Sequence, residues 1–267
     1  MRVRLTILFF SLFSFSCEKE LPWDIDAQDN DLLIVEALIT NEKTTHLVKL
    51  SHTNPESNGG FNPASGATVV ISDGVTNELL LEFPAGSGLY FTSSDFRALF
   101  GRPYFLFIQY NGKNYSAADA SVPGQPFNNE AVYKESDNGL YTLNFSGGED
   151  PSMTRYFMNW TQSPNCETSN DGCLAKVIYY DLKTVDVNQN FRPEKEIVYF
   201  PKETIILRKK YSLSEPYRQF LRSMLSETEW RGGYFDIQRG NVLTNMSEGA
   251  VGFFAVSTVV TDSTIVQ

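Results

Sequence analysis

The chain has 267 residues, of which 42% are hydrophobic and 13% aromatic, and its formal net charge is −10. This acidic balance argues against a nucleic-acid partner, because phosphate binding needs clustered lysine and arginine. The length suits one large domain or two small ones and can bury a hydrophobic core without the help of metals. The aromatic content favours β-strands.

The chain begins with a short hydrophobic segment, residues 5–16, which follows Arg2 and Arg4 and ends immediately before Cys17. A basic start, an apolar core and small residues before the cleavage point are typical of a signal peptide, and the cysteine makes it a lipoprotein signal. A transmembrane helix and an ordinary secretory leader are the alternatives, but a membrane span needs about 20 apolar residues. We predict that residues 1–16 are removed and that the Cys17 thiol carries acyl chains that anchor the protein.

Two further cysteines, Cys166 and Cys173, enclose a hexapeptide rich in turn-forming residues. In an oxidising cell envelope, such a pair favours a local disulfide. Free thiols and a metal site are the alternatives, although a zinc site needs four ligands and no histidine or second cysteine pair is near in sequence. The sequence therefore predicts a Cys166–Cys173 disulfide, with neither a metal site nor a cofactor.

Residues 17–31 are acidic and aperiodic, which is typical of a tether. Beyond them, residues 32–122 contain seven short alternating segments separated by turn signals, including Asn111-Gly112, a strong hairpin signal. This spacing predicts an antiparallel β-sandwich. The predicted strands cover residues 32–40, 46–53, 67–72, 78–83, 89–91, 104–110 and 113–118.

Two prolines and a glycine in residues 122–126 predict a boundary, because they cannot extend a sheet. Residues 127–267 then form a second region that is also rich in strand patterns. We expect a C-terminal β-rich domain with one amphipathic helix. Its predicted strands cover residues 130–135, 140–145, 154–162, 176–182, 196–200, 204–208 and 250–260.

The helix is predicted near residues 213–228, where apolar residues recur with helical spacing. Ser212 and Glu215 resemble a capping box, in which a serine caps the first turn and a glutamate follows three residues later. Such a stripe usually packs against a core. The stripe consists of Tyr217, Phe220, Leu221, Met224 and Leu225.

No pattern in the sequence indicates catalysis. The two histidines, His46 and His52, would lie about 20 Å apart along one strand and could not share a metal ion. Neither lies in a zinc-protease motif, and no nucleophile elbow or phosphate-binding loop is present. We expect both histidines to be structural, with a general-base role as the alternative.

Neighbouring carboxylates are the remaining candidates for chemistry. Glu135 and Asp137, or Glu149 and Asp150, could serve a glycosidase only if the fold placed them across a cleft. Surface loops account for them more simply. Near the end of the chain, residues 241–245 and the glycines before residue 253 predict a loop that leads into a buried terminal strand, with a ligand-facing loop as the alternative.

Several segments resemble the DUF 4249 (domain of unknown function) lipoproteins of Bacteroidota. They are the leader up to Cys17 and residues 33–40, 65–73, 88–90, 110–115, 241–245 and 252–254. The resemblance implies an outer-membrane lipoprotein, commonly encoded beside a TonB-dependent transporter. It also implies an N-terminal domain similar to immunoglobulin or carboxypeptidase regulatory domains.

From these observations we expect a non-enzymatic, surface-exposed outer-membrane lipoprotein that is accessory to a TonB-dependent transporter in substrate capture. The alternative is a structural or adhesive cell-surface protein without a small-molecule ligand. An envelope hydrolase is a third hypothesis, and it requires a carboxylate pair in a cleft. No ligand-binding residue can be named from the sequence.

Overall fold

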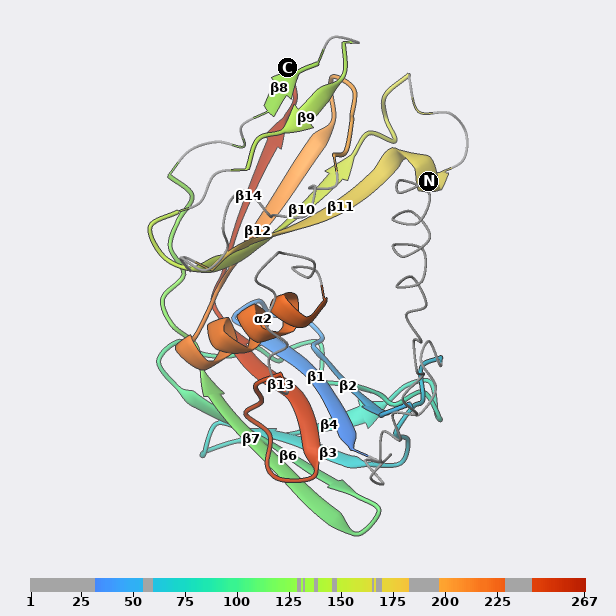
Figure 1. Cartoon of the computed structure of the whole chain (residues 1–267), viewed down its shortest axis with the longest axis vertical. Helices are drawn as coiled ribbons and strands as arrows, with labels where there is room; N and C mark the ends of the chain where they lie inside the picture. Colours follow the sequence, from blue (N-terminus) through green and yellow to red (C-terminus); the bar gives the residue numbers. More distant parts are fainter. Residues whose placement is uncertain are drawn as a thin grey trace, which may run out of the picture. The chain divides into compact units, whose positions relative to one another are not determined.

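The computed structural model describes residues 32–54, 60–128, 131, 133–136, 139–145, 148–164, 166, 170–182, 197–228 and 242–267. They belong to one compact unit, Asp31–Gln267. Within this described part the protein is mainly β with a single α-helix, α2 (Glu215–Thr228), which confirms the predicted fold class (Figure 1). The predicted signal peptide and tether, and with them Cys17, lie outside the described residues.

The larger sheet has eight strands in the order β13-β1-β2-β5-β4-β3-β6-β7. Its first seven strands by sequence pair antiparallel, as predicted, whereas β13 pairs parallel to β1. The hairpin predicted at Asn111-Gly112 joins β6 to β7. The strands are β1 (Leu33–Thr40), β2 (Leu47–His52), β3 (Thr68–Ser72), β4 (Asn77–Glu82), β5 (Leu89–Phe91), β6 (Pro103–Tyr110), β7 (Lys113–Ala120) and β13 (Ala250–Ser257).

The two end strands of this sheet, β7 and β13, approach each other, so the sheet nearly closes into a barrel. The Val256 backbone N–H donates to the Asp119 carboxylate at 2.9 Å. The segment before β13 bridges the remaining gap, since the Asn245 side chain donates to the carbonyls of Ala118 and Phe254 at 3.1 and 2.8 Å. Inward residues of these strands, such as Leu50, form the first core.

The smaller sheet has the order β11-β10-β12-β14 and is antiparallel throughout. A short hairpin of β8 and β9 contributes to the core on one of its faces, and α2 contributes to the core on the other. The strands are β8 (Tyr133–Glu135), β9 (Tyr141–Leu143), β10 (Ser152–Asn159), β11 (Leu174–Asp181), β12 (Ile205–Ser212) and β14 (Val259–Ile265).

Helix α2 lies between the two sheets (Figure 1) and packs through the predicted apolar stripe. Leu221 and Leu225 are 3% and 1% exposed, and they share a core with Met153 of β10 and Phe253 of β13. Because both sheets contribute to this core, burial of apolar area joins them into one body.

The predicted capping box is wrong in its register. The helix begins at Glu215, and the Ser214 hydroxyl, not that of Ser212, accepts the Tyr217 N–H at 3.3 Å. The Glu215 carboxylate instead accepts from Arg218 at 2.7 Å. Ser212 is the last residue of β12, and its hydroxyl donates to the Val122 carbonyl at 2.9 Å.

Two of the strands predicted in the second region differ from those in the structure. Residues 197–199 are not in a strand, and Phe200 forms only an isolated bridge with Tyr141. The strand predicted over residues 250–260 is two strands, β13 and β14, which enter different sheets on either side of Thr258.

Candidate functional site

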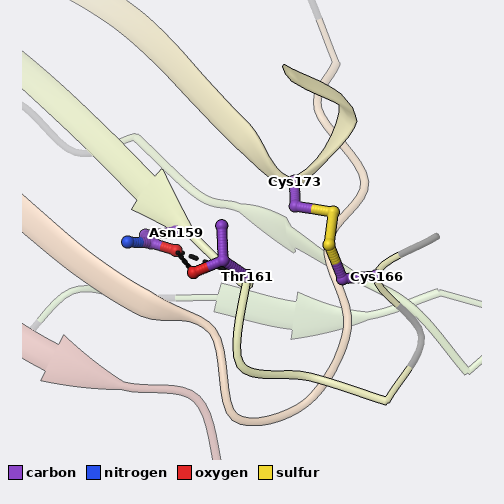
Figure 2. Close-up of a disulfide and its surroundings, with 4 residues drawn as sticks. All are labelled: Asn159, Thr161, Cys166 and Cys173. Atoms are coloured by element: carbon purple, nitrogen blue, oxygen red, sulfur yellow. Dashed lines mark hydrogen bonds between the residues drawn. A yellow bond between two sulfur atoms is a disulfide. The ribbon is translucent and has the colours of Figure 1, made fainter. Parts of the chain in front are cut away.

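The predicted disulfide is present. Cys166 and Cys173 are bonded, with their Cα atoms 5.7 Å apart, and they tie the turn after β10 to the start of β11 (Figure 2). Cys173 ends a short 3₁₀ turn, η1 (Asn170–Cys173). The Asn159 carboxamide oxygen accepts from the backbone and hydroxyl of Thr161 at 3.0 and 2.8 Å, which fixes the first bend of the same turn (Figure 2).

The two histidines lie in separate structural settings. His46 is 5% exposed, its ring is hydrogen-bonded to the Thr40 hydroxyl at 2.9 Å, and Phe96 packs edge-on against it. The His52 ring is hydrogen-bonded to the Tyr110 hydroxyl at 2.9 Å. Both of these ring hydrogen bonds join residues of the larger sheet and its connecting segments.

A cavity of about 360 Å³ lies where the connector after β7 passes the smaller sheet. Its wall comes from the connector around Pro126, from residues 148–152 and from the end of β12. A hydrogen bond joins the connector to the end of β12, since the Ser212 hydroxyl donates to the Val122 carbonyl at 2.9 Å. The Gly148 N–H donates to Asp181 of β11 at 3.0 Å, which holds the segment at residues 148–152 to the same sheet. A cleft where separate segments of a chain meet is a common place for a ligand site.

Lys210 of β12 is the one basic residue among the described residues that line the cavity. Its ammonium donates to the Pro126 carbonyl at 2.9 Å and lies 4.4 Å from the centre of the Phe127 ring. The Arg208 guanidinium contacts the same ring at 4.0 Å and pairs with Asp262. Burial, and then the positive charge of Arg208, lower the pKa of Lys210.

Both members of one predicted carboxylate pair, Glu149 and Asp150, also line this cavity. Of the other pair, Glu135 is exposed in β8, and Asp137 lies outside the described residues. No histidine or cysteine is among the described residues that line the cavity. The cavity therefore offers an ammonium donor, carboxylates and neutral polar groups, which suit binding of a small polar molecule.

Sequence reasoning missed Lys210 and Phe127. The available signal was the run of three basic residues from Arg208 to Lys210, which is unusual inside a strand pattern. Each basic side chain has its own partner, and that of Lys209 is Glu42 at 2.7 Å. The predicted strand over residues 204–208 stopped where these charges begin, whereas β12 continues to Ser212.

The segment before β13 is a loop, as predicted, and it leads into a strand that contributes to the barrel core. Within it, Asn245 both donates to the Phe254 carbonyl and accepts the Phe254 N–H, at 2.8 and 3.0 Å. These bonds give the loop a structural role. Asn241 lies outside the described residues.

The described residues were also searched for groups of metal ligands and for helices that could span a membrane. Among them, no group of three or more histidine, cysteine or acidic side chains is arranged to hold a metal ion. In the same residues, no helix has the length and apolar character needed to cross a membrane.

A family model described as "Domain of unknown function (DUF4249)" matches residues 18–263. A search of curated proteins found no match to this chain. The match covers the barrel, α2 and nearly all of the smaller sheet, and it includes the segments that carried the resemblance after Cys17. The chain therefore belongs to the DUF4249 family.

Proposed function

We propose that this protein is a non-enzymatic, surface-exposed outer-membrane lipoprotein that captures substrate for a TonB-dependent transporter. The observation that carries the proposal is the cavity of about 360 Å³ that contains Lys210. The leader ending at Cys17 and membership of the DUF4249 family support the location. The location and the transporter partner remain expectations from the sequence.

The chemistry of the cavity indicates the kind of ligand. An ammonium has three N–H donors, and one of those on Lys210 goes to the Pro126 carbonyl. No other hydrogen bond of this ammonium is made to the described residues, so the remaining donors suit a ligand that presents acceptor oxygens. Asn128 and Ser152 in the wall add neutral polar groups. We therefore expect a small polar ligand rich in oxygen atoms.

A comparison of Lys210→Met with Lys176→Met tests capture. Lys210→Met keeps most of the aliphatic stem and removes the ammonium, while Lys176 is an exposed residue of β11 outside the cavity wall. Growth and uptake on single nutrients should fall in Lys210→Met cells and stay normal in Lys176→Met cells. Normal uptake in both strains, at normal protein levels, would argue against capture in this cavity.

The partner is tested by purifying a tagged protein in mild detergent. A large outer-membrane barrel should co-purify with it, and recovery of the tagged protein alone would count heavily against the proposal. Deleting the gene separates capture from adhesion. A nutrient-uptake defect supports capture, whereas a defect in attachment with normal uptake supports the structural or adhesive alternative.

The anchor is tested by metabolic labelling with a palmitate analogue. The mature protein should be labelled, and Cys17→Ser should abolish the label. Protease added to intact cells should remove the protein if it is exposed at the surface. An unlabelled wild-type protein that retains residues 1–16 would contradict the proposed location.

A further inference from the structure

The face of the smaller sheet that packs against α2 carries basic charges only. Side chains alternate between the two faces of a strand, and Met153 and Tyr211, which share a core with α2, mark this face. The acidic residues of the four strands, Asp181 and Asp262, point to the opposite face. Such a basic face is unusual in a chain of net charge −10. Its charged residues are Arg155 of β10, Lys176 of β11 and Lys209 of β12.

Two of these cations lie directly opposite each other. Arg155 and Lys209 are partners in the antiparallel register of β10 and β12, and like charges in such a position repel. Glu42 offsets Lys209, because both of its carboxylate oxygens accept from the Lys209 ammonium, at 2.7 and 3.0 Å. No acidic side chain of the described residues forms an ion pair with Arg155. One of the two cations therefore lacks a counter-ion in the described part of the chain.

The Arg155 side chain lies against an aromatic ring. Its guanidinium carbon is 4.7 Å from the centre of the Tyr211 ring, and Tyr211 is 5% exposed. The Arg155 Nε atom is buried, and within the described residues it has no hydrogen-bond partner. Arginine keeps its charge throughout the physiological pH range, and native proteins rarely leave a buried N–H donor without an acceptor. The sheet thus presents a positioned cation that needs an acceptor.

Apolar side chains adjoin Arg155 on the same face. Ile178, its partner on β11, is 38% exposed. Phe157, two residues further along β10, is partly exposed and pairs with Leu207 of β12. A ligand held by Arg155 would therefore also meet an apolar surface.

We propose that Arg155 binds the acidic group of a small organic anion. The guanidinium presents paired N–H donors in one plane, which match two oxygens of a carboxylate or a phosphate. Such a group supplies both a negative charge and an acceptor for the Nε–H, whereas a neutral ligand would leave the charge uncompensated. Because the Tyr211 ring holds the guanidinium in one orientation before the ligand arrives, less entropy is lost on binding.

The surroundings narrow the chemistry of the ligand. An inorganic ion would leave Phe157, Ile178 and Leu207 in water, whereas an anion with an apolar or aromatic body would cover them. The acidic remainder of the chain repels anions, so binding is favoured only where cations lie close together, as Arg155 and Lys209 do. We therefore expect an amphipathic acid, bound through its acidic group at Arg155 and through its apolar part beside Phe157.

Nuclear magnetic resonance of the full-length chain in mild detergent tests this site. The Arg155 Nε–H signal is identified by its loss in Arg155→Lys. In the wild type it should shift when phenylacetate or phenyl phosphate is added, with a dissociation constant of about 0.1 to about 10 mM. The tighter of the two shows whether the site suits a carboxylate or a phosphate. Phenylacetamide has the same apolar body without the charge and should bind about tenfold more weakly or worse.

Substitutions separate the roles of charge and geometry. Arg155→Met removes the guanidinium and should weaken phenylacetate binding about tenfold or more, as followed by the backbone signal of Ile178. Arg155→Lys keeps the charge without the paired donors and should weaken binding less. Lys134→Met is the matched control and should bind like the wild type, because Lys134 is exposed in β8, whose hairpin packs on the opposite face of the sheet. Circular dichroism identifies a variant that fails to fold, and the comparison with phenylacetamide needs no variant.

Three results would overturn the proposal. The first is an Arg155 signal that moves with neither anion, and the second is one that moves equally with phenylacetamide. The third is a signal that moves only when phosphatidylglycerol is mixed into the detergent, which would assign Arg155 to an anionic membrane surface. Lys210 points to the opposite face of β12, so the outcome at Arg155 and the outcome for the Lys210 cavity are independent.

Discussion

Gly252 allows β13 to lie beside β1. Its φ is +98°, a backbone conformation that residues with side chains rarely adopt. It pairs with Val35 of β1, and a Cβ atom built on Gly252 would overlap the Val35 backbone oxygen. Both conditions require glycine, which accounts for the glycine in the segment at residues 252–254 that resembles the family.

We expect Gly252→Ala to lower the free energy of unfolding by about 3 kcal/mol or more, because both backbone strain and overlap must be relieved. Gly74→Ala is the matched control. Gly74 has a φ of +82°, but nothing lies within 4 Å of a Cβ atom built there, so only the strain of about 1–2 kcal/mol applies. Urea denaturation of the three proteins measures the difference, and equal losses in both variants would show that the overlap is unimportant.

His46 should make folding sensitive to mild acid. Burial is the main cause that lowers its pKa from 6.5, against a backbone hydrogen bond at Thr44 and the charge of Glu42, which raise it. Because the unfolded chain takes up a proton near pH 6.5 and the folded chain resists it, this stability is complete above pH 6.5. It is lost as the pH falls from there through the folded pKa.

We therefore expect the urea midpoint of the wild type to fall between about pH 7.5 and about pH 5. His46→Gln removes the titrating group, so its midpoint should depend less on pH over this window, although the variant is less stable at neutral pH because packing against Phe96 is lost. Parallel pH profiles of the two proteins would exclude His46 as a source of the acid sensitivity.

At the scale of the element, Asp119 joins the two end strands of the barrel. It lies in β7 and accepts the N–H of Val256 in β13 at 2.9 Å. Burial is the main cause that raises its pKa above 3.8, against hydrogen bonds that lower it. A carboxyl with a raised folded pKa contributes full stability below its unfolded pKa, and that contribution is lost as the pH rises through the folded pKa.

Two substitutions at this position should therefore act in opposite directions. Asp119→Asn keeps an acceptor for the Val256 N–H and removes the buried charge, so we expect stability at pH 7 equal to or above that of the wild type. Asp119→Ala leaves the N–H without its partner and should cost about 1–3 kcal/mol. Thermal unfolding at pH 7 measures both, and a larger loss in Asp119→Asn than in Asp119→Ala would contradict the role of burial.

Elements were predictable from sequence where the pattern is local. The strands at residues 33–40 and 103–110 alternate, and the hairpin between β6 and β7 has its own turn residues. Residues 250–260 are apolar almost throughout, so nothing local marks the change of sheet at Thr258. The parallel pairing of β13 with β1 joins residues far apart in sequence, and no local pattern specifies such a contact.

The candidate site was less predictable for the same reason. The disulfide follows from two cysteines close in sequence, so composition and spacing were enough. The cavity instead brings Pro126, Asp150 and Lys210 together from three separate segments. Their contact depends on tertiary packing, and a single lysine carries no signal of its own.

At the scale of the whole molecule, the C-terminal strands connect both sheets. β13 pairs with β1 in the barrel, and β14 pairs with β12 in the smaller sheet, with Thr258 between them. Phe254 of β13 contributes to the barrel core, while Phe253, its neighbour, contributes to the core under α2. Unfolding either sheet therefore exposes apolar area of the other, so the two should unfold together.

A chain that ends at residue 128 should fail to fold, although it contains the whole predicted sandwich of residues 32–122. Without β13, the edge of β1 is unpaired and the core loses Phe254 and Val256, both 0% exposed in the full chain. Adding residues 242–257 as a separate peptide should restore protection of the β1 amides to hydrogen exchange, because that peptide supplies the missing strand and its bridging loop. The same peptide with Gly252→Ala should not, since its overlap with Val35 blocks pairing. A cooperatively folded chain of residues 1–128 without the peptide would show that β13 is an addition to the barrel rather than part of it.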